Sequence, residues 1–340
     1  MMSKKSVLIV TTLLITMVFS ANMAFAAEYT FSYGNQQPEA SPRSQSMLWF
    51  EKELEKRSDG RIEVEIHHSG VLGTEQEMFE MTVSGEIQGT RGGFWTQLNK
   101  EYFLIYVPFL FNNYEEWLHF NKSEMVENMN KKGSINGIYI PTSGVFGFRN
   151  ILTTYGVIKE PSDLEGKKHR APGQEPVIWW YEAMGANPQN MAFSDVYMAL
   201  KTGVIDGACN DPSTLYTNKT HEAAPYFSNL DYLAGGPDPL MVNMAWYESL
   251  PDDLKKIFDE VSVEAMDYSN ELFRSLNVEF TQKLIEESKE AFVLADHPEL
   301  IPVWQEASAP VAGRLIEAGF FTQEQLDEAR RIVEEFRNSK

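Results

Sequence analysis

Two arginines and an asparagine, Arg149, Arg170 and Asn210, stand among glycines, prolines and short apolar segments in the middle of the chain. An arginine guanidinium is planar and permanently charged, and two of its N–H groups match the two oxygens of a carboxylate. An asparagine amide adds a directed donor without adding charge. We therefore expect these side chains to converge on a small anion in a cleft, where water screens charges less than at a surface. The alternative for each arginine alone is a surface ion pair.

The pattern of apolar residues predicts the strands and helices around these residues. Alternation of apolar and polar residues predicts strands at 29–33 and 62–66, and steps of three and four residues predict helices at about 43–56 and 75–84. Strands that alternate with helices predict an α/β fold with parallel strand pairing. A length of 340 residues favours two domains over a single core.

Ligands of such folds bind beyond the carboxyl ends of the strands. Arg149 directly follows an expected strand at 144–148, and Arg170 directly follows the segment 167–169. Asn210 comes shortly after a short strand and turn expected at 204–207. The sequence therefore predicts that the three side chains share one pocket.

The segment 85–95 predicts either a buried strand or a surface loop. It carries Gly89, Gly92 and Gly93 around Arg91, and glycines within a strand often mark the close approach of another group. As a strand, the segment would place Arg91 and Gly93 on one face and make them a wall of the pocket. As a loop, it would leave Arg91 in solvent.

A long segment without glycine or proline lies between Pro251 and Pro298. Apolar residues recur along it at helical spacing, at Ile257, Val261, Met266, Leu272, Leu276 and Phe280. A helix of nearly forty residues would reach roughly 55 Å, because each residue adds about 1.5 Å. Such a helix is longer than one small domain, and we expect it to brace both lobes of the protein.

Residues 1–26 have the pattern of a secretory signal peptide. Lys4 and Lys5 precede an apolar run at 7–19, and the segment ends in the small-residue cleavage pattern Ala24-Phe25-Ala26. A membrane anchor is the alternative, but the run is short for a span. Cleavage would remove two lysines and no acidic residue, so the formal charge of −20 would become −22. We therefore expect export, and an acidic chain argues against nucleic acid as a partner.

Chemistry other than anion binding has less support. The sequence lacks the nucleophile elbow, the phosphate-binding loop, the zinc-protease motif and the dinucleotide fingerprint. The adjacent His67 and His68 would point to opposite faces of a strand, without further ligands at suitable spacing, so we expect no metal or other cofactor. Cys209 is the only cysteine. It is expected to be a buried small residue, whereas a secreted enzyme would use Cys209 or Glu75.

A third hypothesis is a zwitterionic ligand. The adjacent Trp179 and Trp180 could cage a quaternary ammonium group through cation–π contacts. A solute of the ectoine or betaine type would then be the ligand.

The segment from Arg149 to Asn210 resembles the solute-binding proteins of TRAP transporters, the tripartite ATP-independent periplasmic type. The resemblance is carried by four motifs at consistent spacing, PSDLEGKKHRAPG (161–173), AMGANP (183–188), MAFSDVYMAL (191–200) and VIDGACN (204–210). Weaker matches at 69–73 and 249–254 extend it over nearly all of the chain after residue 26.

This resemblance implies a two-lobed periplasmic protein that closes on an organic acid and delivers it to a membrane permease. It places Arg170 at the family's principal carboxylate-binding arginine and Arg149 at a second pocket arginine. It also implies that Asn210 is the pocket asparagine and that Phe193 packs on the ligand. Specificity contacts are implied for Glu75 and for the loop at Asn35 and Gln36.

Departures from the family pattern bear on the ligand. Gly93 stands where some binders of acidic sugars carry a glutamate, which argues against a ligand like sialic acid. Ala208 and Cys209 replace a common Gln-Glu pair. Arg91, if it faces the pocket, would be a third cation and would favour a dicarboxylate or a sulfonate.

The lobe boundaries are predicted from the order of these segments. The first lobe is expected to comprise residues 27–147 and about 235–274, and the second lobe residues 148–234 and about 275–340.

Overall fold

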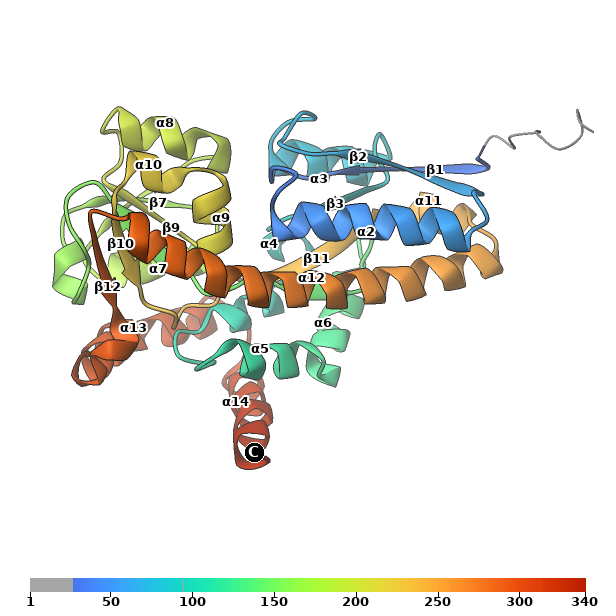
Figure 1. The fold of residues 1–340 in the computed structure, drawn as a ribbon. Coiled ribbons are helices and arrows are strands. Elements are labelled where there is room, and N and C mark those ends of the chain that lie inside the picture. Colours follow the sequence, from blue (N-terminus) through green and yellow to red (C-terminus); the bar gives the residue numbers. More distant parts are fainter. Residues whose placement is uncertain (1–26, 94) are drawn as a thin grey trace, which may run out of the picture.

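The computed structural model describes residues 27–93 and 95–340. The predicted signal peptide, residues 1–26, lies outside the described residues. The chain forms two lobes side by side, each around its own β-sheet, as the α/β prediction required (Figure 1). Among the described residues, no helix has both the length and the apolar character needed to cross a membrane.

The sheet of the first lobe has the strand order β2-β1-β3-β11-β4, and β5 also pairs with β11. β1 is parallel to β2 and to β3, whereas β11 is antiparallel to β3, β4 and β5. The strands are β1 (Tyr29–Gly34), β2 (Ile62–His67), β3 (Gly89–Arg91), β4 (Ile138–Tyr139), β5 (Ser143–Val145) and β11 (Pro237–Asn243).

The sheet of the second lobe has the order β12-β10-β6-β9-β7-β8. β6 runs antiparallel to both β9 and β10, and the other pairs are parallel. The strands are β6 (Asn150–Thr153), β7 (Lys168–Ala171), β8 (Asn187–Asn190), β9 (Gly207–Asn210), β10 (Tyr226–Asn229) and β12 (Glu290–Val293). The predicted parallel pairing is present in both sheets, but β6 and β11 run antiparallel to their neighbours, so both sheets are mixed.

The helices of the first lobe begin and end on clear local signals. α2 starts behind the cap Ser41 with a proline in its first turn, and α3 starts with a capping box between Thr74 and Glu77 and ends on the left-handed Gly85. The helical elements up to β4 are α2 (Pro42–Arg57), α3 (Glu75–Ser84), α4 (Trp95–Leu98), η1 (Lys100–Tyr106), α5 (Tyr114–Asn121) and α6 (Glu124–Gly133), and α11 (Met244–Ser249) follows β11.

The helical elements of the second lobe lie between its strands and at the C-terminus. Those between strands are η2 (Pro161–Leu164), α7 (Glu175–Ala183), η3 (Phe193–Asp195), α8 (Val196–Lys201), α9 (Pro212–Thr217) and α10 (Thr220–Ala223). After β12 come η4 (Leu294–Asp296), η5 (Pro298–Leu300), α13 (Ile301–Glu317) and α14 (Gln323–Asn338).

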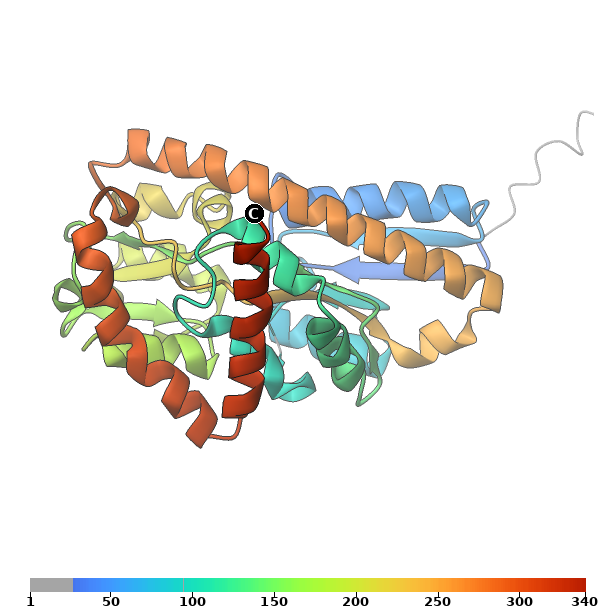
Figure 2. The ribbon, with the colours of Figure 1, turned by 90° about the horizontal axis from the view of Figure 1, so that it is seen from below.

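The predicted long helix is α12 (Asp252–Glu287), with 36 residues. Its rise of 1.5 Å per residue gives a length of about 54 Å. It packs against α2 of the first lobe and against α9 of the second, and it runs along both lobes (Figure 2). α12 therefore ties the two lobes together along one side.

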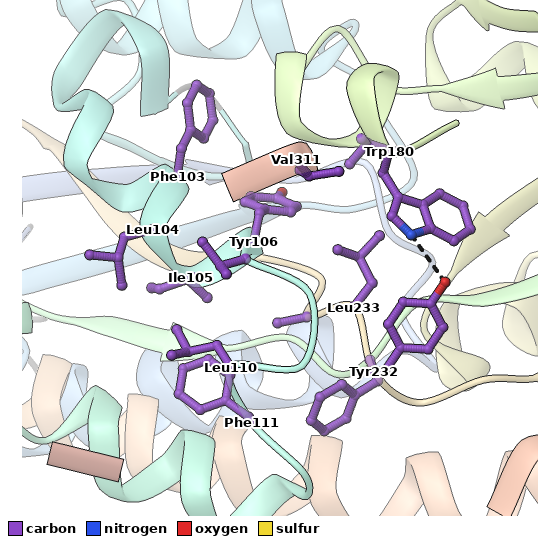
Figure 3. Packing of buried hydrophobic residues seen from close by; sticks show 14 of the residues in the cluster. Phe103, Leu104, Ile105, Tyr106, Leu110, Phe111, Trp180, Tyr232, Leu233 and Val311 are labelled. Atoms are coloured by element: carbon purple, nitrogen blue, oxygen red, sulfur yellow. Dashed lines mark hydrogen bonds between the residues drawn. The ribbon is translucent and has the colours of Figure 1, made fainter. Parts of the chain in front are cut away.

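The largest hydrophobic cluster also joins the two lobes. It combines aromatic residues of η1 and α5 with Trp180 of α7 and Trp304 of α13. Figure 3 shows part of this cluster, including Tyr106 of η1 and Trp180. α14 returns from the second lobe and packs on α5, where Arg337 forms ion pairs with the buried Glu116 at 2.7 and 3.0 Å. The lobe boundaries stay a prediction. The boundary expected at about residue 274 lies within α12, and α14 contacts α5 in the first part of the chain.

Candidate ligand-binding site

Three strands of the second lobe bring Arg149, Arg170 and Asn210 to one edge of the sheet. Because β7 and β9 are parallel, Arg170 lies opposite Ala208, close to where Asn210 ends β9. Because β6 is antiparallel to β9, its start lies at the end of β9, and Arg149 directly precedes it. Arg170 thus lies within β7 instead of behind it, and Arg149 precedes a strand instead of following one.

A small cavity between the lobes, here named the inner cavity, is lined by all three residues. Its volume is about 50 Å³. The second lobe also contributes Phe193, the first residue of η3. The facing wall comes from the first lobe and includes Gln37, Arg43 and Glu75.

Arg170 is 5% exposed, and its guanidinium has few partners. Nε and Nη2 each donate to the carbonyl of Met191 at 3.3 Å, and the guanidinium carbon lies 5.5 Å from the centre of the Phe193 ring. Burial, and then the positive charge of Arg149, lower the pKa of Arg170 to about 10. The side chain is therefore a desolvated cation that an incoming anion would stabilise.

Arg149 is held by neutral groups. Nη1 donates to the carbonyl of Cys209 at 3.2 Å and Nη2 to the carbonyl of Gly235 at 3.4 Å. The guanidinium lies 5.9 Å from the centre of the Tyr106 ring, and its buried Nε has no hydrogen-bond partner among the described residues. Neither Arg149 nor Arg170 has a carboxylate within 4.0 Å in the part of the chain that the structure describes.

Arg91 was predicted as a possible third cation of the pocket, and the structure places it elsewhere. Its guanidinium forms a short ion pair with Asp238 of β11 and donates to Ser46 at 2.9 Å and to Ser269 at 3.0 Å. It does not line the inner cavity. Arg91 was expected either in the pocket wall or in solvent, and it lies in neither place, because Asp238 pairs with it inside the first lobe.

Arg43 takes the place in the cavity wall that the sequence suggested for Arg91. It is 3% exposed, and its Nη2 and Nε lie 3.1 and 3.2 Å from the two oxygens of Asp238. Its Nη1 lies 3.4 Å from Oε1 of Glu75, and its guanidinium covers the Phe146 ring at 5.0 Å. The charge of Arg43 is therefore already balanced by Asp238 and Glu75.

Of the other residues predicted in the first lobe, Glu75 and Gln36 line a cavity and Asn35 does not. Glu75, the first residue of α3, lines the inner cavity and packs over Gly92, where a Cβ atom would come 3.0 Å from the Glu75 carboxyl carbon. Gln36 lines a second, larger cavity beside the inner one. Asn35 is fully buried and lines neither, so its predicted contact with the ligand is corrected. Its Oδ1 accepts from the backbone of Gln37 at 2.7 Å and thereby shapes the loop.

Sequence reasoning missed Gln37, Arg43, Phe146 and Gln174, all of which line the inner cavity. The sequence does contain a signal for Arg43. It precedes Met47, Phe50 and Leu54 by four, seven and eleven residues, and this spacing places it on the apolar face of α2. A charge on such a face requires a buried partner. Gln37, Phe146 and Gln174 left no comparable pattern.

Side-chain hydrogen bonds between described residues join the two walls of the cleft. Asn218 donates from Nδ2 to Oε1 of Gln37 at 3.0 Å. Gln174 donates from Nε2 to the carbonyl of Gly93 at 2.9 Å. These bonds link the two walls of the cleft.

The structure gives little support to an ammonium cage, to catalysis by Cys209 or to a metal site. The proposed ammonium cage is wrong, because Trp180 lies in the core with its indole donating to Tyr232 at 3.1 Å (Figure 3), and Trp179 stacks on Phe320. Cys209 is buried and does not line the inner cavity. Within residues 27–93 and 95–340, no three His, Cys, Asp or Glu side chains come together as a metal site.

Comparison with known proteins identifies the family. The sequence profile of the bacterial extracellular solute-binding protein family 7 matches residues 33–318. The C4-dicarboxylate-binding periplasmic protein DctP of Rhodobacter capsulatus is 28% identical over 285 residues, which cover 82% of this chain and 83% of that protein.

Solved structures share the fold. The sugar acid binding protein DctPAm of Advenella mimigardefordensis, in complex with galactonate, has a TM-score of 0.84 at 22% identity and covers 90% of this chain and 98% of its own. A TRAP periplasmic solute binding protein of Sulfurospirillum deleyianum with bound succinate has a TM-score of 0.84 at 23% identity, with 90% and 99% covered. The chain belongs to the bacterial extracellular solute-binding protein family 7, the solute-binding proteins of TRAP transporters.

Proposed function

We propose that this protein captures a small organic acid anion between its two lobes and delivers it to the membrane permease of a TRAP transporter. Arg170 is the principal ligand of the carboxylate, with Arg149 and Asn210 beside it and Phe193 packed on the ligand. The observation that carries the proposal is the pair of buried guanidiniums at the inner cavity, which have only neutral hydrogen-bond partners among the described residues.

Desolvation of the two guanidiniums favours the binding of an anion. A buried cation without a counter-ion is costly, and the cost falls when an anion with good hydrogen-bond geometry arrives. Arg149 and Arg170 carry this cost in the free protein, whereas the facing Arg43 does not. A carboxylate between them would accept N–H donors from both and would be shielded from water by the facing lobe.

The known relatives set the class of ligand. Those named above bind C4-dicarboxylates, galactonate and succinate, all of which are organic acids. Family members and structural neighbours are solute-binding transport proteins. We therefore propose binding and release of an unchanged acid instead of catalysis by Cys209 or Glu75.

Location and partner follow from the same family. Relatives are named periplasmic binding proteins, and residues 1–26 have the sequence pattern of a signal peptide. We propose that the mature protein works in the periplasm and meets the permease there with its cleft closed on the acid.

A thermal-shift screen of the mature protein tests the proposal. The panel contains organic acids, sugar acids, sulfonates and ectoine, each with the wild type and with Arg170→Ala. Binding only to the native state at 100 times Kd stabilises by about 2.7 kcal/mol and raises the melting temperature. We expect at least one acid to stabilise the wild type and to lose most of that effect with Arg170→Ala. Equal shifts for both proteins, or no shift with any acid, would refute the proposal.

A further inference from the structure

A second cavity, here named the outer cavity, continues from the inner one. Its volume is about 490 Å³, and it shares Glu75, Gly93, Arg170, Pro172, Gln174 and Phe193 with the inner cavity. The inner cavity of about 50 Å³ has room for only a few water molecules, each of which needs at least about 10–15 Å³. A carboxylate group fits there, but the rest of an organic acid must extend into the outer cavity.

The charges of the outer cavity disfavour a second carboxylate. Among its described lining residues Arg170 is the only cation, whereas Glu75 and Glu175 are two acids. Of the other two arginines of the inner cavity, Arg149 is assigned to the same carboxylate as Arg170, and Arg43 is already engaged by Asp238 and Glu75. A dicarboxylate that placed one group on Arg170 would therefore point the other toward glutamates, and like charges brought together cost affinity.

The outer cavity is instead rich in neutral hydrogen-bonding groups. Five amide side chains line it, from Gln36, Gln76, Gln97, Gln174 and Asn190. An amide presents both donors and acceptors, and a hydroxyl group can serve either role in return. Some of these amides bond within the protein, as Gln174 does to Gly93 and Gln97 to Gln76. Each amide still has further donor or acceptor positions, which hydroxyl groups of a ligand would satisfy and alkyl or aromatic parts would not.

Glu175 has a carboxylate oxygen without a hydrogen-bond partner among the described residues. It is the first residue of α7 and lines the outer cavity, and this oxygen, Oε2, is buried. A buried acceptor without a donor is costly and rare in native structures. A ligand hydroxyl placed in the outer cavity would donate to it.

We propose that the ligand is a polyhydroxylated monocarboxylate, an acid of the aldonate or uronate type. This inference rests on the proposed function. The carboxylate binds in the inner cavity at Arg149, Arg170 and Asn210, and the hydroxylated carbons lie in the outer cavity. Glu175 accepts a hydrogen bond from one hydroxyl and selects against a second carboxylate.

Calorimetry on the mature protein tests the inference with D-glucuronate, D-galactonate, succinate, D-glucarate and ectoine. We expect one of the two monocarboxylic sugar acids to bind at least tenfold tighter than succinate, glucarate and ectoine. Glu175→Gln should weaken that sugar acid about tenfold or more, because hydrogen bonds to charged groups are the stronger ones. The same substitution should leave succinate unchanged or improve it.

Glu182→Gln is the matched control, because Glu182 lies at the other end of α7 and pairs with Arg314 on the surface. It should bind like the wild type, and a melting curve of each variant verifies its folding. Tightest binding of succinate, glucarate or ectoine would overturn the inference, and so would wild-type affinity of Glu175→Gln for the sugar acid. If Arg170→Ala still weakens the tightest acid, the proposed function survives this failure.

Discussion

Each lobe contains a pair of buried arginines, and the two pairs differ in their counter-ions. Arg43 and Arg91 of the first lobe share the carboxylate of Asp238. Arg149 and Arg170 of the second lobe form no ion pair with a described residue, and they donate hydrogen bonds to backbone carbonyls and, for Arg149, to the Cys209 thiol. All four are at most 6% exposed. Burial alone therefore does not mark a binding arginine, whereas a missing internal counter-ion does.

The difference assigns separate tasks to the two pairs. The first pair joins α2 and β3 to β11 and so helps to build the lobe, and Arg91 also reaches Ser269 on α12. The second pair is left with unmet charge at the inner cavity. Removing a charge should therefore harm stability on one side of the cleft and ligand affinity on the other.

The largest expected effect comes from Asp238→Asn. The substitution leaves Arg91 and Arg43 buried without their shared carboxylate, and breaking a buried ion pair in this way costs about 3–5 kcal/mol. Urea denaturation should show this loss in the free energy of unfolding. The control Asp267→Asn removes a surface pair with Lys122 and should cost less than about 1 kcal/mol. If Asp238→Asn lowered the free energy of unfolding as little as Asp267→Asn, Asp238 would not be the counter-ion that stabilises Arg43 and Arg91.

His169, next to Arg170, is expected to make the stability of the second lobe depend on pH. His169 is fully buried, with Nε2 2.9 Å from the Tyr155 hydroxyl, and burial lowers its pKa from 6.5 to about 4. Below pH 6.5 the unfolded chain binds a proton that the folded chain refuses, so stability falls as the pH drops from 6.5 toward 4. The contribution lost between pH 7 and pH 5 is about 2 kcal/mol.

Unfolding of His169→Gln, measured at pH 7 and at pH 5, checks this expectation. The variant should show a smaller difference between the two pH values than the wild type. His297→Gln, at an exposed histidine, should retain the wild-type difference. If His169→Gln and the wild type lose the same stability on acidification, His169 is not the group responsible.

A smaller effect is expected where the two halves of the cleft touch. Asn218→Ala removes the hydrogen bond to Gln37 across the cleft. A net hydrogen bond contributes about 0.5–1.5 kcal/mol, so ligand affinity should fall by roughly two- to tenfold if the bond belongs to the closed form. Calorimetry with the tightest acid measures the change, and Asn338→Ala on the exposed end of α14 is the control. Unchanged affinity would show that the bond does not contribute to closure.

Much of the fold was predictable because helical signals are local. The predicted helix at 75–84 coincides with α3, whose capping box and left-handed Gly85 are encoded within a few residues. The long uninterrupted segment before Pro298 became α12. The strand pairing was not predictable in the same way, because β11 joins the first sheet from more than a hundred residues away.

The same contrast explains the site. Arg149, Arg170, Asn210 and Phe193 lie within one segment whose motifs have a recognisable order, and the structure brings all four to the inner cavity. Arg91 and Arg43 could not be told apart from the sequence, since the residue that decides between them, Asp238, follows Arg43 by 195 positions. The motifs of one segment predicted the cavity residues of the second lobe. The residues of the first lobe that face them are recognised only from contacts between distant parts of the chain.

The most direct test of the account is the affinity of Arg170→Met for the tightest acid of the panel, measured by calorimetry beside the wild type. Truncating a charge that pairs with a buried ligand carboxylate should cost about 2–5 kcal/mol, which is at least thirtyfold in Kd. The free variant should unfold with at least the free energy of the wild type, because it loses a desolvated cation and no ion pair. Wild-type affinity of Arg170→Met would contradict the account.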